Sequence, residues 1–531
     1  MIPRPSIADR AALRVFQAGA LAVVLAAAPY KAFDLDRFFV PKEFVLHATA
    51  VLVTVLCLIR ARRLTVGRVD QLIGIFLVLG VLSALFSTNG WLAERSVAIS
   101  LSGAACFWSA RALARSGLAR PLLAALALAA VLGAVTALLQ AYGVRTDFVS
   151  LNRAPGGTFG NRNFMAHVCV IAFPTMMLVA TTAPSRRAFG WWAAAFALVA
   201  GALILSRSRA AWLALIVTAA VLVPLVFIAL VRGRSGLRLR RLLFLPVAAA
   251  LGAAIALVLP NTLDWRSDSP YIDTAKSVVN YKEGSGHGRL VQYGNTLRMS
   301  LHHPILGVGP GNWAVVYPRF ASEGDPSLAE DGTTSNPWPS SDWMTFVSER
   351  GLAAACILGL ALLALVVDGL RGVRGADTPE GRLAACALVG TVAALLVVGT
   401  FDAVLLLPPP ALVSWALLGA LAPPSRERAA ASLTLPRRAL LLLVVAALGA
   451  IAVARSAAQL QAMSIFSGSN RTSQLERAST LDPGSYRIHV RLAEGYLRRG
   501  SCTRVRSHAA AARALFPNAP RPKHLLALCG R

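Results

Sequence analysis

Two arginines stand between two apolar runs with almost no loop to separate them. Arg207 and Arg209 follow the run 189–206 and precede the run 210–231. A charged residue at the centre of a membrane span costs about 2.5–3.5 kcal/mol on insertion scales. Snorkelling of the long side chains to the membrane surface is one explanation. The other is a fixed cation site for phosphate, because a guanidinium donates two parallel hydrogen bonds to such an anion.

A second group of candidate residues lies in a polar, glycine-rich stretch farther along the chain. Arg289 follows His287 at the start of the segment 288–303, which has helical spacing, and His303 stands at its end. Asn312 follows in the sequence Leu-Gly-Val-Gly-Pro-Gly-Asn. Arg289 is as well explained by a surface position at a helix start as by a ligand, and a histidine at a helix end is more often a cap than a catalyst.

A third group precedes the apolar run 162–183. Asn161 and Asn163 lie in the stretch Gly-Gly-Thr-Phe-Gly-Asn-Arg-Asn-Phe-Met-Ala-His. Backbone N–H groups at the start of such a helix can receive a phosphate. The simpler alternative is a loop that passes into a helix with Asn161 as its cap.

Composition restricts the setting in which these groups operate. The chain has 531 residues, of which 56% are hydrophobic and 15% charged, with a mean hydropathy of +0.60. Soluble domains carry about 25% charged residues, so a disordered chain and an ordinary soluble enzyme are excluded. The net charge of +28 resides mostly in arginines between apolar runs, which is typical of membrane topology rather than of a nucleic-acid partner. The sequence contains neither metal-ligand spacing nor a nucleotide-binding glycine pattern, and we expect no metal and no cofactor.

Apolar runs long enough to cross the hydrocarbon core recur through most of the chain. They predict an all-α polytopic membrane protein with about 12–13 transmembrane helices; Pro408, Pro409 and Pro410 interrupt the last of the runs and make the count uncertain by one. The predicted spans are 13–30, 42–59, 70–87, 93–113, 121–141, 162–183, 189–206, 210–231, 242–260, 351–369, 384–403, 408–423 and 439–455.

Basic clusters predict the orientation. Every arginine cluster follows an even-numbered span, and further arginines precede the first span, which indicates a cytoplasmic N-terminus. The long stretch 261–350 then lies outside, and a loop of that length is usually functional. The clusters occupy 60–68, 111–120, 186–187, 232–241, 371–382 and 426–438.

The tail after residue 455 differs from the rest. Its polar helical pattern resembles tetratricopeptide repeats with a period of 34 residues, and a basic helical hairpin is the alternative. Thirteen spans place the tail outside and twelve place it inside. If it is outside, we expect a disulfide between Cys502 and Cys529. The predicted division is 1–260 for nine helices, 261–350 for the outer loop, 351–455 for the remaining helices and 456–531 for the tail.

Three segments in this order resemble the O-antigen ligase and polymerase superfamily of membrane glycosyltransferases. They are GTFGNRNFMA, SRSRAAWLAL, and GR followed by LRMSLHHPILGVGPGNW with Tyr317-Pro318. Glu349 and Gly351 at the next span also match, and the resemblance covers about 30–425. It implies a C-type glycosyltransferase-like fold in the bacterial inner membrane. Tetratricopeptide-like tails occur in some members.

The resemblance also implies an activity. Members transfer a glycan from a polyprenyl diphosphate, typically undecaprenyl diphosphate, to an acceptor hydroxyl outside the cytoplasmic membrane. By this resemblance Arg209 and Arg289 hold the diphosphate, with Arg207 beside them. The substrate-facing loops then contribute Asn161, Asn163, His287 and Asn312. The acceptor is a lipid, a protein or another glycan, and the tail offers a surface for a protein partner.

This sequence departs from the family at one position. Ligases carry a histidine shortly before the span that begins with Glu-x-Gly, and here Ser340 stands there. Asp342 and His303 are the first substitutes to test as proton acceptor, although Asp342 is equally well explained as a helix cap. The alternatives are a polysaccharide polymerase of the same superfamily and, from another class, a lipid-linked glycan transporter or an inactive scaffold.

Overall fold

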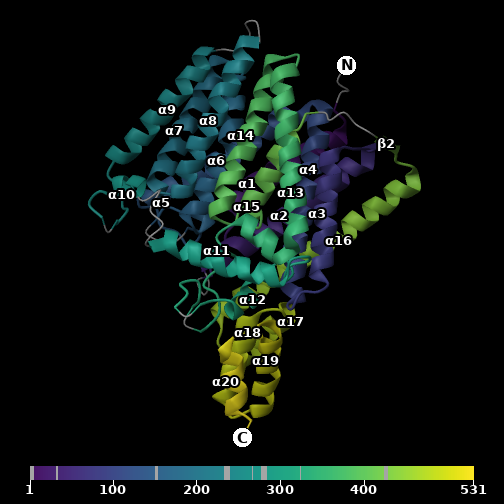
Figure 1. Ribbon diagram of the computed structural model, residues 1–531, viewed down its shortest axis with the longest axis vertical. Helices are drawn as coiled ribbons and strands as arrows, with labels where there is room; N and C mark the ends of the chain where they lie inside the picture. The colour runs from purple at the N-terminus through teal and green to yellow at the C-terminus, as the bar shows by residue number, and fades with distance from the viewer. Residues whose placement is uncertain are drawn as a thin grey trace.

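The computed structural model consists almost entirely of helices, most of which run side by side through the height of the molecule (Figure 1). The structure describes residues 5–530 except 31–33, 150–153, 233–238, 266, 277–283, 323, 330 and 424–428. Each predicted span falls on one helix. The helices are α1 Ile7–Leu25, α2 Asp34–Arg60, α3 Arg68–Ala84, α4 Gly90–Leu113, α5 Ala119–Ala141, α6 Arg162–Thr181, α7 Arg186–Ser206, α8 Arg209–Arg232, α9 Leu239–Val258, α13 Asp342–Gly375, α14 Pro379–Phe401, α15 Pro408–Leu421 and α16 Leu435–Gly468.

The protein is an all-α polytopic membrane protein. Within the described residues, nine helical segments are long and apolar enough to cross a membrane, and one of them is the continuous stretch through α4 and α5. The helix α13 begins at Asp342, before the predicted span start at Gly351. At Gly351 φ is 82°, and a Cβ would stand 2.0 Å from the carbonyl oxygen of Ile305. Only glycine fits this kink, so α13 changes direction where the span was predicted to begin.

Packing is densest around α6 and α14. The most apolar window of α6 is 89% buried and that of α14 is 72% buried, whereas the window of α16 is only 11% buried. The side chains of α15 between these helices are buried throughout. The first residues of α6 and the residues after α14 therefore adjoin the most deeply buried part of the bundle.

The face at which the N-terminus lies carries the arginine-rich connections (Figure 1). Arg438 donates to the carbonyl of Ile59 at 3.2 Å, and Arg241 donates to that of Thr181 at 3.2 Å. These contacts bring the ends of α2, α6, α9 and α16 to one face, as the predicted orientation requires. From the predicted clusters, Arg4, Arg234, Arg238, Arg426 and Arg428 lie outside the described residues.

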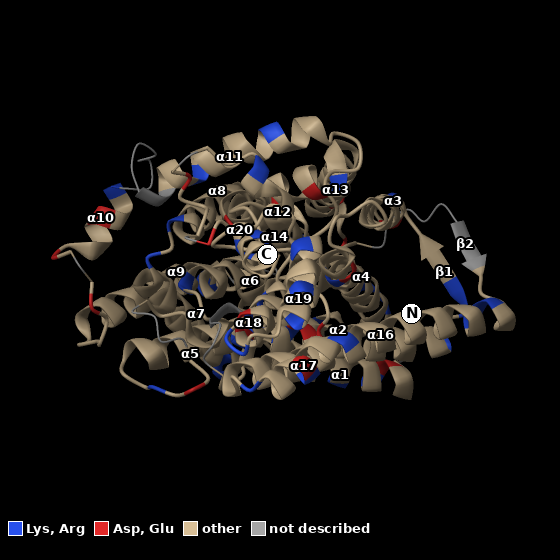
Figure 2. Cartoon of the chain, turned by 90° about the horizontal axis from the view of Figure 1, so that it is seen from below, with Lys and Arg blue, Asp and Glu red and all other residues tan. Residues whose placement is uncertain are grey.

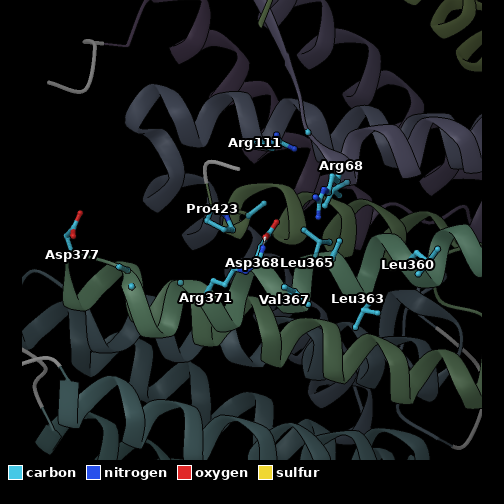
Figure 3. Close-up of a pocket in the computed structure, with 17 residues that line it drawn as sticks. Arg68, Arg111, Leu360, Leu363, Leu365, Val367, Asp368, Arg371, Asp377 and Pro423 are labelled. Atoms are coloured by element: carbon cyan, nitrogen blue, oxygen red, sulfur yellow. Dashed lines mark hydrogen bonds and ion pairs between the residues drawn. The ribbon is translucent and has the colours of Figure 1, made fainter. Parts of the chain in front are cut away.

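The same face holds a two-stranded sheet and a cavity. Strand β1 (Arg63–Val66) pairs antiparallel with β2 (Ala429–Ser432). The cavity has a volume of about 1290 Å³ and lies between α13 and the ends of α3 and α4 (Figure 3). Its walls are mainly apolar, with Arg68, Arg111 and Arg371 among its lining residues.

The opposite face carries the long polar segment and the tail (Figure 1). The segment contains α10 (Pro270–Lys276), α11 (Gly284–His302) and α12 (Trp313–Val316). Figure 2 shows α11 running along one edge of the bundle on this face. The two termini lie on opposite sides, which favours thirteen crossings over twelve.

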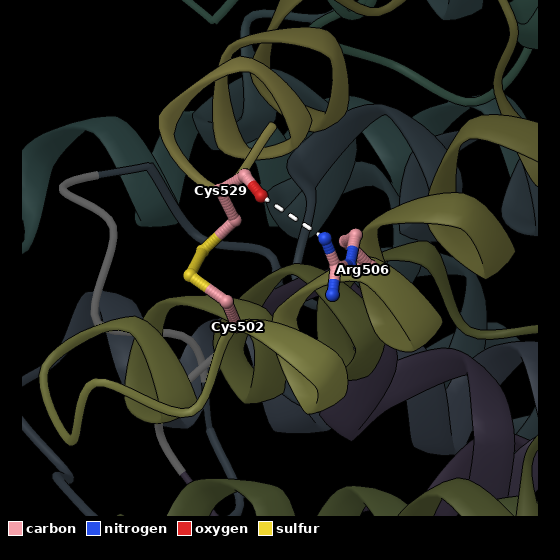
Figure 4. The surroundings of a disulfide bond; sticks show 3 residues. All are labelled: Cys502, Arg506 and Cys529. Atoms are coloured by element: carbon pink, nitrogen blue, oxygen red, sulfur yellow. Dashed lines mark hydrogen bonds between the residues drawn. A yellow bond between two sulfur atoms is a disulfide. The ribbon is translucent and has the colours of Figure 1, made fainter. Parts of the chain in front are cut away.

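The tail consists of short helices stacked below the bundle (Figure 1). They are α17 Thr472–Leu481, α18 Tyr486–Leu497, α19 Cys502–Leu515 and α20 Pro520–Leu528. The predicted disulfide between Cys502 and Cys529 is present and ties the start of α19 to the end of α20 (Figure 4). The amide of Asn518 donates to the carbonyl of Val315 at 3.1 Å, so the tail is anchored on the long loop.

Candidate active site

Side-chain hydrogen bonds fix α11 above the ends of two membrane helices. The hydroxyl oxygen of Tyr293 lies 2.6 Å from the carbonyl oxygen of Ser340 and 2.8 Å from that of Thr400, and its single proton is shared between these two acceptors. The side-chain oxygen of Gln292 accepts from the backbone N–H of Ser340 at 2.7 Å. Residues three and four apart share one face of a helix. Arg289 precedes Gln292 and Tyr293 by one turn, and therefore lies on the face of α11 that covers the start of α13 and the end of α14.

Arg289 acts electrostatically on Asp402, which follows α14 directly and is buried. Burial raises the pKa of Asp402 to about 6, although the charge of Arg289 and a hydrogen bond from the side chain of Asn163 lower it. Three segments far apart in the sequence thus meet at this carboxyl group. The carboxyl group is half-ionised near pH 6 and mostly ionised at neutral pH, and titratable groups with shifted pKa values beside a cation are typical of sites that transfer protons.

His167 lies one turn beyond Asn163 on α6. It is buried, and neither ring nitrogen has a hydrogen-bond partner among the residues that the structure describes. The guanidinium of Arg289 acts on it electrostatically. Buried polar groups are rarely left unpaired outside functional sites, so His167 belongs with the residues around Asp402.

The arginines of the α7–α8 turn reach the start of α6 from another direction. Arg207 has φ of 50°, the one positive φ outside glycine in the described part of the chain. Its Nε donates to the hydroxyl of Thr274 at 2.7 Å, and its guanidinium lies 4.5 Å from the ring centre of Trp265. Burial lowers the pKa of Arg207, which Tyr271 and Asp273 partly offset. A strained, non-glycine conformation at such a turn is a mark of function.

Arg162 connects the two groups of cations. It is the first residue of α6 and stands 5.6 Å from the ring centre of Trp265. Both Arg207 and Arg209 act on it electrostatically. Its neighbour Asn163 bonds to Asp402. The first turn of α6 is therefore close both to the arginines of the α7–α8 turn and to Asp402, on which Arg289 acts.

Two predicted site residues, Asp342 and Asn161, accept hydrogen bonds from backbone N–H groups. Both carboxylate oxygens of Asp342 accept from backbone N–H groups, Val404 at 2.9 Å and Leu405 at 3.0 Å, which ties the start of α13 to the α14–α15 connection. Asn161 caps α6 by accepting from the N–H of Asn163 at 2.8 Å. Asp342 therefore positions the segment that follows Asp402.

The histidines of α11 lie apart from this centre. His303 is exposed just beyond the end of α11. At a rise of about 1.5 Å per residue it stands roughly 20 Å from Arg289 along the helix axis. His287 is exposed near the start of α11. The structure does not bring His303 to Asp402.

The glycine-rich block that carried much of the resemblance has an architectural role. Asn312 is buried, and its side-chain oxygen accepts a hydrogen bond of 2.7 Å from the backbone N–H of Asn89. The carboxylate of Glu349 accepts from the N–H groups of Gly311 at 2.7 Å and Trp313 at 3.1 Å. At Gly307, with φ of 67°, a Cβ would stand 2.3 Å from the backbone of Glu349. The block locks the loop after α11 onto α13.

Sequence reasoning missed Asp402 and His167. The signal for Asp402 was present, because an acidic residue near the end of the apolar run 384–403 is an ionisable group at the membrane, which is a functional candidate by default. His167 was in a glycine- and asparagine-rich motif but had no role assigned. In the part of the chain that the structure describes, no three His, Cys, Asp or Glu side chains gather as a metal site would require.

Residues 194–357 match the family model described as O-antigen ligase. The matched segment includes Arg207, Arg209, Arg289 and Asp342. It does not reach Asn163, Asp402 or the tail, so the repeat assignment of the tail stays a prediction. No curated protein matches the chain.

Proposed function

We propose that this chain, part of which matches the family model described as O-antigen ligase, is a member of the O-antigen ligase and polymerase superfamily and transfers a glycan from a polyprenyl-diphosphate carrier to an acceptor hydroxyl on the tail side of the membrane. One observation carries the proposal. Arginines of α8 and α11 flank the first turn of α6, where a buried carboxyl group also lies. A diphosphate leaving group needs cations, and an attacking hydroxyl needs a proton acceptor.

Arg209 and Arg289 bind the diphosphate, and Arg207 supports the turn that carries Arg209. As the bond between the anomeric carbon and the diphosphate oxygen breaks, the electron pair leaves with the phosphate. Fixed cations at a water-poor membrane edge stabilise that developing charge without reorganisation. The donor linkage supplies the free energy, so the reaction consumes no nucleotide.

Asp402 accepts the proton of the acceptor hydroxyl while the oxygen of that hydroxyl attacks the anomeric carbon. Two features support this role over Asp342 and His303. Asp402 is within electrostatic reach of Arg289, and both carboxylate oxygens of Asp342 accept from backbone N–H groups. The family histidine is replaced by Ser340, whose backbone holds α11 in place beside Asp402.

The compartment of the reaction follows from charge and redox chemistry. The arginine-rich face is assigned to the cytoplasm of a bacterial inner membrane, and the tail face to the periplasm. The disulfide of the tail supports the same orientation, because disulfides persist in oxidising compartments.

The test uses a strain that lacks the gene, complemented with the wild type, Arg209→Ala or Arg289→Ala. We expect neither variant to restore glycan transfer at wild-type protein levels. Arg298→Ala, farther along α11, is the matched control and is expected to restore it. Full transfer by either of the first two variants would remove that residue from the mechanism.

The glycan profile of the deletion strain distinguishes the acceptors. Long chains retained on the carrier lipid indicate a ligase, whereas short, unpolymerised units indicate a polymerase.

A further inference from the structure

A second cavity lies where the tail meets the membrane bundle. It has a volume of about 270 Å³, and its walls come from α2, α4, the loop before α13, the α14–α15 connection, α16 and the tail. Small-molecule sites commonly measure ~300–1,000 Å³. The cavity is therefore large enough for a small polar group and too small for a lipid chain.

Aromatic side chains form much of the wall. The ring of Trp338 lies 5.5 Å from that of Phe39, and the ring of Tyr486 lies 4.9 Å from that of Phe516. Trp91 lines another part of the cavity. Such rings combine an apolar face with a polar edge. A ligand that presents both C–H faces and hydroxyl groups suits this wall.

The charges of the cavity disfavour an anion. Its two lining arginines are paired, Arg95 with Glu43 at 2.7 Å and Arg487 with Asp36 at 3.1 Å. Asp482 accepts from the indole N–H of Trp91 at 2.7 Å. Carboxylates outnumber cations in the lining, so a diphosphate would be repelled, while hydroxyl groups find acceptors.

One hydroxyl group in the wall lacks a partner. The oxygen of Tyr486 is buried and has no hydrogen-bond partner among the described residues. Burial and the nearby charge of Asp331 raise the pKa of Tyr486 to about 12, so the group is a neutral donor. An unpaired buried hydroxyl in a cavity wall calls for a ligand or a water molecule.

The cavity adjoins the candidate active site. Trp338 stands two residues before Ser340, and Leu406, Leu407 and Pro408 follow Asp402 by a few residues. A substrate that reacts at Asp402 can therefore extend into it.

We propose that this cavity binds one sugar ring of the glycan substrates, with the tail as one of its walls. The proposal rests on the proposed function, and it gives the tail a role in holding substrate. Tyr486 and Asp482 bond to sugar hydroxyl groups, and Trp338 packs on a ring face. The sugar belongs either to the acceptor or to the far end of the donor glycan.

The test measures binding of oligosaccharides, released by mild acid from the cell-envelope glycans of the source bacterium, to the full-length protein in lipid nanodiscs. Isothermal titration gives Kd. We expect Trp338→Ala to raise Kd about tenfold and Tyr486→Phe to raise it about three- to tenfold. Trp191→Ala removes an exposed tryptophan elsewhere and is expected to leave Kd within twofold.

Arg289→Ala separates this proposal from the proposed function. It is expected to abolish transfer and to leave saccharide Kd within twofold. Lost binding in Arg289→Ala with wild-type binding in both cavity variants would overturn the cavity. Binding of a cationic oligolysine peptide in the cavity, with no displacement of saccharide, would also overturn the proposal. Tyr486→Phe keeps the packing of the ring, so a raised Kd in this variant is not explained by a change in the folded structure.

A transfer assay identifies which substrate, acceptor or donor, supplies the sugar that binds in the cavity. A raised KM for the acceptor in Trp338→Ala assigns the cavity to the acceptor, and a raised KM for the donor assigns it to the donor glycan. Unchanged KM for both would contradict the proposal.

Discussion

The two faces of the bundle both hold arginines, but they use them differently. At the N-terminal face, Arg111 pairs with Asp70 at 2.7 Å and Arg371 with Asp368 at 3.4 Å. Both arginines and Asp368 line a mainly apolar cavity (Figure 3). At the tail face, Arg289 lies above a carboxyl group whose pKa burial has raised toward neutrality.

The charged groups of the two faces also differ in where they lie in the sequence. On the N-terminal face Arg371 and Asp368 lie within one helix, α13, and Arg111 and Asp70 join the neighbouring helices α3 and α4, whereas Arg289, Asn163 and Asp402 come from three segments far apart in the sequence. Pairs within one helix or between helices adjacent in the chain neutralise charge and serve stability or membrane topology. Charges gathered from distant segments onto a buried group are the better mark of a reaction site.

The largest effect is expected at Arg289. Arg289→Ala should lower the transfer rate about 100- to 1,000-fold, the usual loss when one stabilising donor is removed. Arg371→Ala on the other face should stay within twofold, because its pair is exposed and weak. Transfer from a lipid-linked donor in proteoliposomes measures both. Equal losses would erase the distinction between the faces.

Asp402→Asn is expected to lower the rate about 100-fold or more by removing the proton acceptor. The wild-type rate should also depend on pH. Only the ionised carboxylate accepts a proton, and the pKa of Asp402 is about 6. The rate should therefore be constant above pH 7 and fall about tenfold per pH unit below 6. A flat profile from pH 5 to 8 would exclude Asp402 as the base.

Asn163→Ala should change the transfer rate less than Asp402→Asn does, and it should shift the pH dependence of the rate in one direction. Its hydrogen bond lowers the pKa of Asp402, so its loss should move the acid limb of the pH–rate profile upward by about one unit. Asn161→Ala, which removes only the helix cap, should lower stability and leave the limb in place. A downward shift in Asn163→Ala would contradict the assigned bond.

The smallest effect on transfer is expected in the tail. Cys502→Ser with Cys529→Ser opens a disulfide that spans 27 residues, which should destabilise the tail by about 3 kcal/mol. Thermal unfolding followed by limited proteolysis of the tail measures this. Transfer should fall less than threefold at low temperature, because neither cysteine contacts the cavity. Abolished transfer with a folded tail would show that the disulfide matters for chemistry.

Much of the helical layout was predictable because hydropathy reports directly on membrane burial. Every predicted span lies on a helix, and the helical segment 288–303 lies within α11 apart from its last residue. The disulfide followed from compartment and composition. These features depend on local sequence, and local sequence is what periodicity measures.

The site was only partly predictable. Arg289 and Asn163 were named from motifs, yet their meeting point, Asp402, was not, since only the packing of α14 against α6 brings it there. Conversely, Asn312 was named as a site residue because it lies in a specific motif, but its side chain bonds to the backbone of Asn89 and supports the loop. Motif residues can preserve a loop shape as readily as a reaction.

The docking of the tail on the long loop has a consequence for biogenesis. When α15 has left the ribosome, every arginine of the site and Asp402 already exist, but the wall that Tyr486 forms does not. The tail helices α17–α20 therefore complete this cavity, and a chain that ends between α16 and α17 would lack one of its walls.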